Sequence, residues 1–304
     1  MMKRLSSSIG FAILYGMASL TQGAGYSLEL DMSTGYNSNV FLESDDLVVN
    51  DESLGSNQID MQTQVAITGN IEFWDKTNSD ASIMLDYFKE TLLDNSLDTT
   101  VMTLSVPMHY YQGDYRYGAT FTRQAYNLSG VDVLEYFVSK VDVAKKTGNN
   151  TLYFSYGFTD KGAQDASYSD YNGTSQSGAL KYTVDYRGKK WTIKGNVFQN
   201  NYAGEGLSNT GSYIKTVYQV YRGHHVMSGS VKLKGTQYEL DSFTNDERSD
   251  RQLSFNYNHE YILNSTMQLY FDASYIRNQS NIEYTDENYN YNQWINTLGA
   301  RFVF

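Results

Sequence analysis

From Tyr26 onward the sequence alternates between apolar and polar residues with a period of two. Residues 28–33 read Leu-Glu-Leu-Asp-Met-Ser, and residues 152–158 read Leu-Tyr-Phe-Ser-Tyr-Gly-Phe. Successive side chains of a β-strand point to opposite faces, so this period predicts strands whose two faces meet different surroundings. No stretch shows the 3.6-residue period of an amphipathic helix. The chain is therefore expected to be all-β.

The lengths of the connections between the alternating segments follow a rule. Connections at 75–80, 112–114, 145–149, 188–189, 223–224 and 262–265 are short, and those at 41–57, 91–98, 127–132, 161–175, 203–210, 240–249 and 279–290 are mostly longer and polar. Short and long connections alternate along the chain, which is typical of outer-membrane barrels. A soluble β-sandwich, the alternative, has no reason to sort its loops in this way.

We therefore predict a transmembrane antiparallel up-and-down β-barrel of about 14 strands, with short periplasmic turns, longer extracellular loops and both chain ends in the periplasm. The strands are expected near residues 26–40, 58–74, 81–90, 99–111, 115–126, 133–144, 150–160, 176–187, 190–202, 211–222, 225–239, 250–261, 266–278 and 291–304.

Composition agrees with a barrel and excludes several other classes. Mean hydropathy is −0.51, yet 15% of residues are aromatic. A spanning strand needs only alternate apolar residues, and barrels carry aromatic girdles at both interfaces. The chain has no cysteine, which excludes disulfides, thiolate metal sites and a lipid-anchored amino terminus. Its net charge of −11 argues against nucleic acid as a partner.

The amino terminus has the layout of a secretory signal peptide. Lys3 and Arg4 precede a short, mostly apolar stretch at 9–20, and small residues follow at Gly23 and Ala24. This arrangement predicts cleavage after Gly23 or Ala24. Residues 1–23 are thus expected to be a signal peptide and residues 24–304 a barrel that is exported to the bacterial outer membrane.

The carboxy terminus resembles the assembly signal of outer-membrane proteins, a polar residue and a glycine followed by alternating hydrophobic residues that end in phenylalanine. Here the four positions are filled by Thr297, Gly299, Phe302 and Phe304. The barrel assembly machinery is the partner that such a strand implies. Outer-membrane lipid and lipopolysaccharide are the other expected partners.

Alternation also predicts which charged residues face the lumen. The early and late strands are expected to form an acidic wall, comprising Glu29, Asp31, Asp60, Asp86, Glu260 and Asp272. The middle strands are expected to form a basic wall, comprising Arg116, Lys181, Arg187, Lys194, Lys215, Lys232 and Lys234. Opposed walls would either set up a field across a watery pore or neutralise each other inside a plugged barrel. The loops at 41–57 and 161–175 are the candidates for a constriction.

Catalysis is not expected. The four histidines are His109, His224, His225 and His259, and none is predicted to lie beside a serine or aspartate at the outer rim. No phosphate-binding loop, nucleophile elbow or metal-ligand spacing is present, so neither a cofactor nor a metal is predicted. The external loops are acidic, which indicates a solvated surface more than a calcium site.

Two short motifs resemble those of known outer-membrane barrels. Residues 35–41 read Gly-Tyr-Asn-Ser-Asn-Val-Phe, and residues 275–281 read Tyr-Ile-Arg-Asn-Gln-Ser-Asn, followed by Tyr-Asn-Tyr-Asn at 289–292. They resemble the barrel domains of surface lipoprotein assembly modifiers and of barrels encoded with exopolysaccharide export systems. The chain departs from the lipoprotein modifiers in lacking their amino-terminal helical repeat domain.

The sequence therefore favours a porin-like channel or a secretion or export conduit, for a small polar, saccharide or secreted substrate. The alternative is a non-conducting barrel that presents acidic loops for adhesion or outer-membrane integrity.

Overall fold

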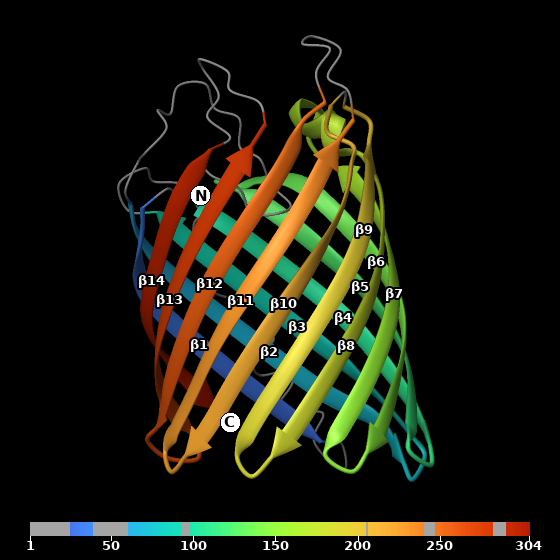
Figure 1. Ribbon diagram of the computed structural model, residues 1–304, viewed down its shortest axis with the longest axis vertical. Helices are drawn as coiled ribbons and strands as arrows, with labels where there is room; N and C mark the ends of the chain where they lie inside the picture. Colours follow the sequence, from blue (N-terminus) through green and yellow to red (C-terminus); the bar gives the residue numbers. More distant parts are fainter. Residues whose placement is uncertain (1–24, 39–59, 93–97, 205, 240–246, 282–289) are drawn as a thin grey trace, which may run out of the picture.

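The computed structural model describes residues 25–38, 60–92, 98–204, 206–239, 247–281 and 290–304. These residues form fourteen strands that close into one barrel (Figure 1). The strands are β1 (Tyr26–Asn37), β2 (Asp60–Lys76), β3 (Ser79–Leu92), β4 (Asp98–Gln112), β5 (Tyr115–Leu128), β6 (Val131–Thr147), β7 (Asn150–Ala163), β8 (Gly173–Tyr186), β9 (Lys189–Tyr202), β10 (Asn209–Arg222), β11 (His225–Tyr238), β12 (Ser249–Ile262), β13 (Met267–Ser280) and β14 (Tyr291–Val303). A short 3-10 helix, η1 (Ala166–Tyr171), joins β7 to β8.

Each strand pairs antiparallel with its neighbours in sequence, and β1 pairs with β14. The predicted fold class and strand count are confirmed. Closure links Glu29 to Val303 and continues to Asn37 and Ile295 at the other end of the seam. Leu28 and Phe304 extend the seam by exchanging backbone hydrogen bonds of 3.1 and 2.8 Å. Closure leaves no unpaired sheet edge, as a lipid environment requires.

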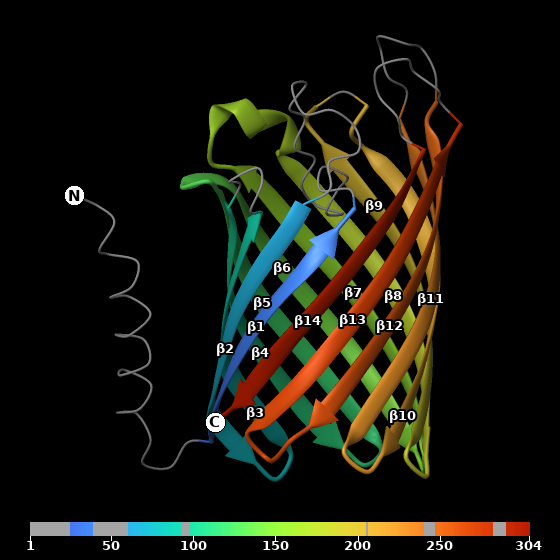
Figure 2. The same cartoon turned by 90° about the vertical axis from the view of Figure 1, so that its left-hand side faces the viewer.

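Short turns gather at one end of the barrel, here called the turn end, and the opposite end is called the loop end (Figure 2). Four two-residue turns at the turn end contain Gly113, Gly148, Gly188 or Gly223, each with a positive φ. Such φ values suit tight hairpins and are readily adopted by glycine. β1 starts and β14 finishes at the turn end, in agreement with the prediction that both barrel termini share one side.

One connection differs from its prediction. The loop expected at 127–132 is a two-residue turn, Ser129-Gly130, between β5 and β6 at the loop end. Both residues have positive φ, 49° and 92°. A tight turn of this kind lets the two strands pair up to the turn itself, so both strands are longer than expected.

The outer face of the barrel is apolar. Large exposed side chains cover it, with exposed fractions such as 62% for Val197, 54% for Leu233 and 62% for Leu298. Aromatic residues mark its turn-end margin, including Tyr110, Tyr117, Tyr186 and Tyr261. A contiguous exposed apolar band with aromatic margins is the surface that a lipid bilayer covers. No helix in the part of the chain that the structure describes is long and apolar enough to cross a membrane.

Two sequence predictions lie outside the described residues. These are the signal peptide at 1–23 and the candidate constriction loop at 41–57.

Gly299 of the terminal motif lies where β14 meets both β1 and β13. A Cβ at Gly299 would overlap the ring of Tyr270 and approach the backbone oxygen of Met32 to 2.7 Å. Tyr270 also donates its hydroxyl hydrogen bond to Asp31 across the seam. Glycine is therefore needed at 299 because the tyrosine ring occupies the space of a side chain.

We predict that Gly299→Ala destabilises the barrel by about 1–3 kcal/mol, the usual cost of forcing extra volume into a packed position. Folded barrel that resists unfolding in detergent, followed against temperature, measures the effect. Gly195→Ala is the matched control, because nothing lies within 4 Å of a Cβ at that strand position. Equal stability of the two variants would contradict this role for Gly299.

Candidate functional site

The strand registers identify the residues that face the lumen. Opposite the apolar outer set lies a polar set, and members of this set meet across an intervening strand. Arg301 of β14 lies 3.8 Å from Glu260 of β12, and Lys161 of β7 lies 2.5 Å from Tyr202 of β9. Side chains two strands apart converge on the concave side of a closed sheet, so this set points inward.

Three acidic residues predicted for the lumen surround one arginine near the turn end. Arg301 Nε lies 3.0 Å from Glu29 Oε1 and 3.1 Å from Asp31 Oδ2, and Arg301 Nη1 lies 3.8 Å from Glu260 Oε1. The guanidinium also lies 5.6 Å from the centre of the Tyr270 ring. We call Glu29, Asp31, Glu260 and Arg301 the seam cluster, since it joins β12, β14 and β1.

The other predicted acidic residues lie apart from the seam cluster. Asp272 of β13 accepts a 2.8 Å hydrogen bond from Asn258. Asp86 of β3 is in register with Thr68 and Thr103, on the inward-facing set. Asp60 starts β2 at the loop end, opposite Asn37. The acidic residues thus occupy several heights along the lumen.

The basic residues of the middle strands are more closely ordered. Lys181, Lys194, Lys215 and Lys232 are direct register partners on the adjacent strands β8, β9, β10 and β11. We call this row the lysine ladder. Lys234, two residues beyond Lys232, lies on the same face of β11 and is the register partner of Tyr213.

Tyrosine rings lie among these cations. Lys194 and Lys232 lie 5.4 and 5.1 Å from the centre of the Tyr213 ring. Lys181 lies 4.6 Å from the Tyr153 ring, which Lys140 and Arg116 also approach, at 5.6 and 5.9 Å. The face of an aromatic ring attracts cations, so each ring stabilises the positive charges around it.

The ladder retains an excess of positive charge. Directly paired side chains leave their strands roughly 5 Å apart, and two like charges held at that spacing would repel by about 0.8 kcal/mol even in water. Cation–π contacts at exposed positions return about 0.5–1 kcal/mol each. Among the residues that the structure describes, no carboxylate forms an ion pair with Lys181, Lys194 or Lys215. The inner wall therefore carries unneutralised positive charge along β8–β10.

Arg116, another residue of the predicted basic wall, forms an ion pair with a carboxylate. Its Nη2 lies 2.8 Å from Oδ1 of Asp142, whose side chain is only 3% exposed. Asp142 lies on β6 and is the register partner of Gly118, where a Cβ would collide with the carboxylate. This ion pair offsets the positive charge of Arg116 on the inner wall.

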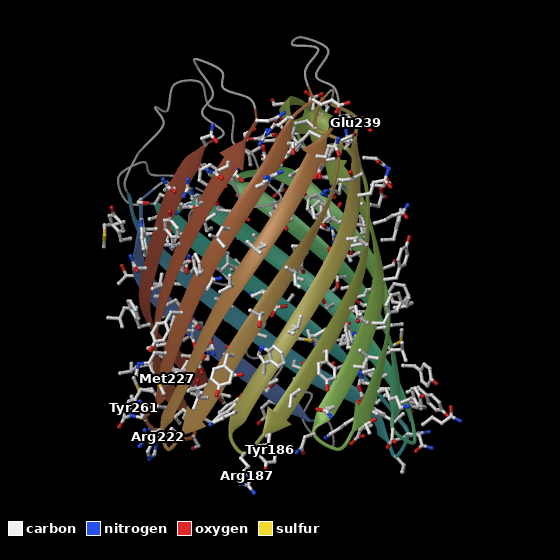
Figure 3. The ribbon with its side chains drawn as sticks, in the orientation of Figure 1. Tyr186, Arg187, Arg222, Met227, Glu239 and Tyr261 are labelled. Carbon is white, nitrogen blue, oxygen red and sulfur yellow. The ribbon has the colours of Figure 1, made fainter. Side chains whose placement is uncertain are left out.

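The placement of Arg187 differs from the prediction. It lies in the β8–β9 turn with φ 49°, and its guanidinium lies 4.9 Å from the ring of the outward-facing Tyr186. Figure 3 shows Arg187 at the turn end, below the barrel wall. The turn comprises residues 187–188 and not 188–189, so Arg187 leaves the strand and does not belong to the basic wall.

The predicted constriction loop at 161–175 folds over the loop-end rim. Tyr168 and Tyr171 of η1 pack on a buried cluster of β6 whose members Leu134 and Tyr136 are 1% and 2% exposed. The segment is anchored at its start by Asp165, which accepts a hydrogen bond from the Ser167 backbone N–H. That hydrogen bond holds the pKa of the exposed Asp165 carboxyl below its usual value. This segment therefore covers the loop-end part of β6 and also contacts β7.

The four histidines lie near the turn end. His109 Nδ1 lies 2.7 Å from Asp80, and His225 and His259 approach to 3.0 Å on the outer face. The described residues contain no group of three or more metal-ligating side chains. That the chain is not an enzyme stays a prediction.

Sequence reasoning missed several lumen residues, namely Lys140, Tyr153, Tyr213, Tyr270 and Arg301. Lys140 and Arg301 could have been found by extending the alternation to every charged residue of their strands. The tyrosines could not, because tyrosine occurs on both faces of this barrel.

Closed antiparallel topology, an apolar outer band and a polar interior together define a transmembrane β-barrel of the bacterial outer-membrane class. Solved structures of that class share the fold. Outer-membrane expressed OmpT of Vibrio cholerae matches with a TM-score of 0.54 at 7% identity, over 92% of this chain and 97% of that one. OccAB3 of Acinetobacter baumannii matches with a TM-score of 0.51 at 7% identity, over 93% and 100% of the two chains.

An anion-selective porin from Comamonas acidovorans has a TM-score of 0.50 at 9% identity, over 93% of this chain and 99% of that one. At these identities the likeness concerns the fold alone. No protein-family model matches the chain, and a search of curated proteins finds no match.

We predict that Lys215→Gln stabilises the barrel by about 1 kcal/mol at low ionic strength, because it relieves repulsion from Lys194 and Lys232. The gain should vanish in 1 M salt, where the Debye length falls to about 3 Å. Thermal unfolding at both salt concentrations measures it. Lys189→Gln, at an exposed outward position of β9, is the control and should leave stability unchanged at either salt concentration. A destabilised Lys215→Gln barrel would show that the lysine is neutralised in the folded protein.

We predict the opposite effect for Arg301→Gln, a loss of about 1.5–3 kcal/mol, since charged hydrogen bonds are lost and three carboxylates are left together. Urea unfolding followed by tryptophan fluorescence gives the free energy. The exposed Arg277 on neighbouring β13 provides the control, Arg277→Gln. A small loss equal to that of the control would mean that the seam cluster does not stabilise closure.

Proposed function

We propose that the chain forms a water-filled conduit across the bacterial outer membrane and that its lumen favours anions. The observation that carries the proposal is the lysine ladder, an ordered row of cations on the inner wall of a closed barrel. Charged rows that line a pore select between ions of opposite sign.

An open lumen is supported by the interior chemistry. Fourteen strands enclose more space than the eight-stranded barrels that side chains fill completely. The ladder lysines are partly exposed, and the described part of the chain has a single small buried apolar cluster, under η1 at the rim. Every described strand contacts its sheet neighbours, and η1 contacts β6 and β7. An inner wall that is polar and partly exposed supports a lumen filled with water.

The inner wall also has a polar hollow of about 400 Å³ that suits hydrated solutes. Lys215 and Asp272 are among its lining residues, together with hydroxyl and amide groups such as those of Ser230 and Asn256. These groups offer both donors and acceptors to a passing molecule.

The proposal covers two routes through the same lumen. One is diffusion of small polar or saccharide solutes, as in porins. The other is passage of a secreted or exported substrate, which the resemblance of the motifs at 35–41 and 275–281 implies. Lipid, lipopolysaccharide and the barrel assembly machinery are the proposed partners in the membrane and during biogenesis.

We predict stepwise ionic currents when the refolded full chain is added to a planar bilayer. In a potassium chloride gradient the reversal potential should have the sign of anion preference, because the ladder attracts chloride and repels potassium. The double variant Lys194→Gln/Lys215→Gln should move the reversal potential toward cations.

The outward-facing Lys189→Gln is the matched control and should keep the wild-type reversal potential. A correctly folded barrel without any open state would contradict the proposal of a conduit and favour the alternative, a non-conducting barrel that displays surface loops. A conducting barrel whose selectivity is the same in the double variant would leave the conduit but overturn the role of the ladder.

A further inference from the structure

Two hollows interrupt the apolar outer face along β11. Gly235 and Gly229 both point outward, and nothing lies within 4 Å of a Cβ at either position. The hollow at Gly235 has a volume of about 530 Å³ and that at Gly229 about 560 Å³. The two glycines are six residues apart on one strand, or roughly 20 Å at the usual rise per residue.

The hollow nearer the loop end combines apolar walls with cations. Ile214, Leu233 and Leu253 line it and are register neighbours on β10, β11 and β12. Arg251 and Arg277 line its rim, from β12 and β13. Both arginines are exposed, and neither forms an ion pair with a carboxylate of the described residues.

The depth of the two arginines matches a headgroup region. Arg251 and Arg277 lie two and three residues from the loop-end limits of their strands, Ser249 and Ser280. An arginine on the lipid face is costly at mid-membrane and is tolerated near the interface. Arginine also binds phosphate oxygens through two parallel hydrogen bonds.

The second hollow, toward the turn end, is apolar and aromatic. Phe255, Tyr257 and Tyr218 line it beside Gly229. A lipid whose charged group binds the two arginines would therefore have apolar surface on its turn-end side. Its acyl chain would extend in that direction.

We propose that this outer face of β10–β13 is a binding site for a membrane lipid whose headgroup carries phosphate. Arg251 and Arg277 bind the phosphate, one acyl chain occupies the hollow at Gly235, and the chain continues toward the hollow at Gly229. The site faces lipid and does not require that the lumen conduct.

The test measures lipid binding to the folded full chain by native mass spectrometry in detergent. Three probes are compared: diphosphoryl lipid A, the same lipid with its phosphates removed, and sodium pyrophosphate. We expect diphosphoryl lipid A to bind and Arg251→Gln/Arg277→Gln to weaken its binding at least about tenfold. Gly235→Leu, which fills the hollow, should weaken binding in the same direction.

Gly195→Leu is the matched control, since Gly195 is another outward strand glycine with nothing within 4 Å of a Cβ. It should bind the lipid as wild type does. Equal binding to all variants, or equal binding of the dephosphorylated lipid, would overturn the proposal. Binding of pyrophosphate as tight as that of the lipid would also overturn it, because the site would then recognise a free anion. The arginine variants lie on an exposed surface, so the test stands even if Gly235→Leu fails to fold.

Discussion

The backbone hydrogen bonds between β1 and β14 are the interaction on which the rest of this structure depends. In a bilayer, every peptide group that water cannot reach needs a partner within the protein, and a sheet meets that requirement only when it closes. Closure here joins residues from opposite ends of the chain, from Glu29 with Val303 to Asn37 with Ile295. Gly299, the Tyr270 ring and the seam cluster all lie at this junction. Packing and charge therefore stabilise the pairing of β1 with β14, two strands that no short turn connects.

Closure also gives the two faces of every strand different solvents. The outer face tolerates large exposed side chains because lipid covers them, and the inner face holds the polar and charged residues. This division explains why the chain has a low mean hydropathy and only a small buried apolar cluster in its described part. Because no larger apolar cluster is buried in this part of the chain, the inner wall is left for polar and charged side chains.

The inner charges follow two opposite designs. At the seam, one arginine is shared by three carboxylates and holds strands together. On β8–β11, four lysines stand side by side at a cost in repulsion, with tyrosine rings beside them. An arrangement that lowers stability is expected at a functional site, and this contrast is why the ladder and not the seam cluster is taken as the selective element. On the outer face, Arg251 and Arg277 resemble the ladder lysines, because they form no ion pair with a carboxylate of the described residues.

The sequence by itself determined the barrel, the approximate strand boundaries and the face of most charged residues, because a period of two is a local property of the backbone. It also determined one pair of the ladder, since the predicted two-residue turn at 223–224 pairs Lys215 with Lys232. The turn between β8 and β9 lies at 187–188, one residue before its predicted place, and this shift both pairs Lys181 with Lys194 and moves Arg187 out of the strand. Only the tertiary structure decided that Lys194 pairs with Lys215, since the six-residue connection at 203–208 sets no unique register. It alone brought Arg301 to Glu29 and Asp31, because contacts between the two ends of a chain exist only once the sheet has closed.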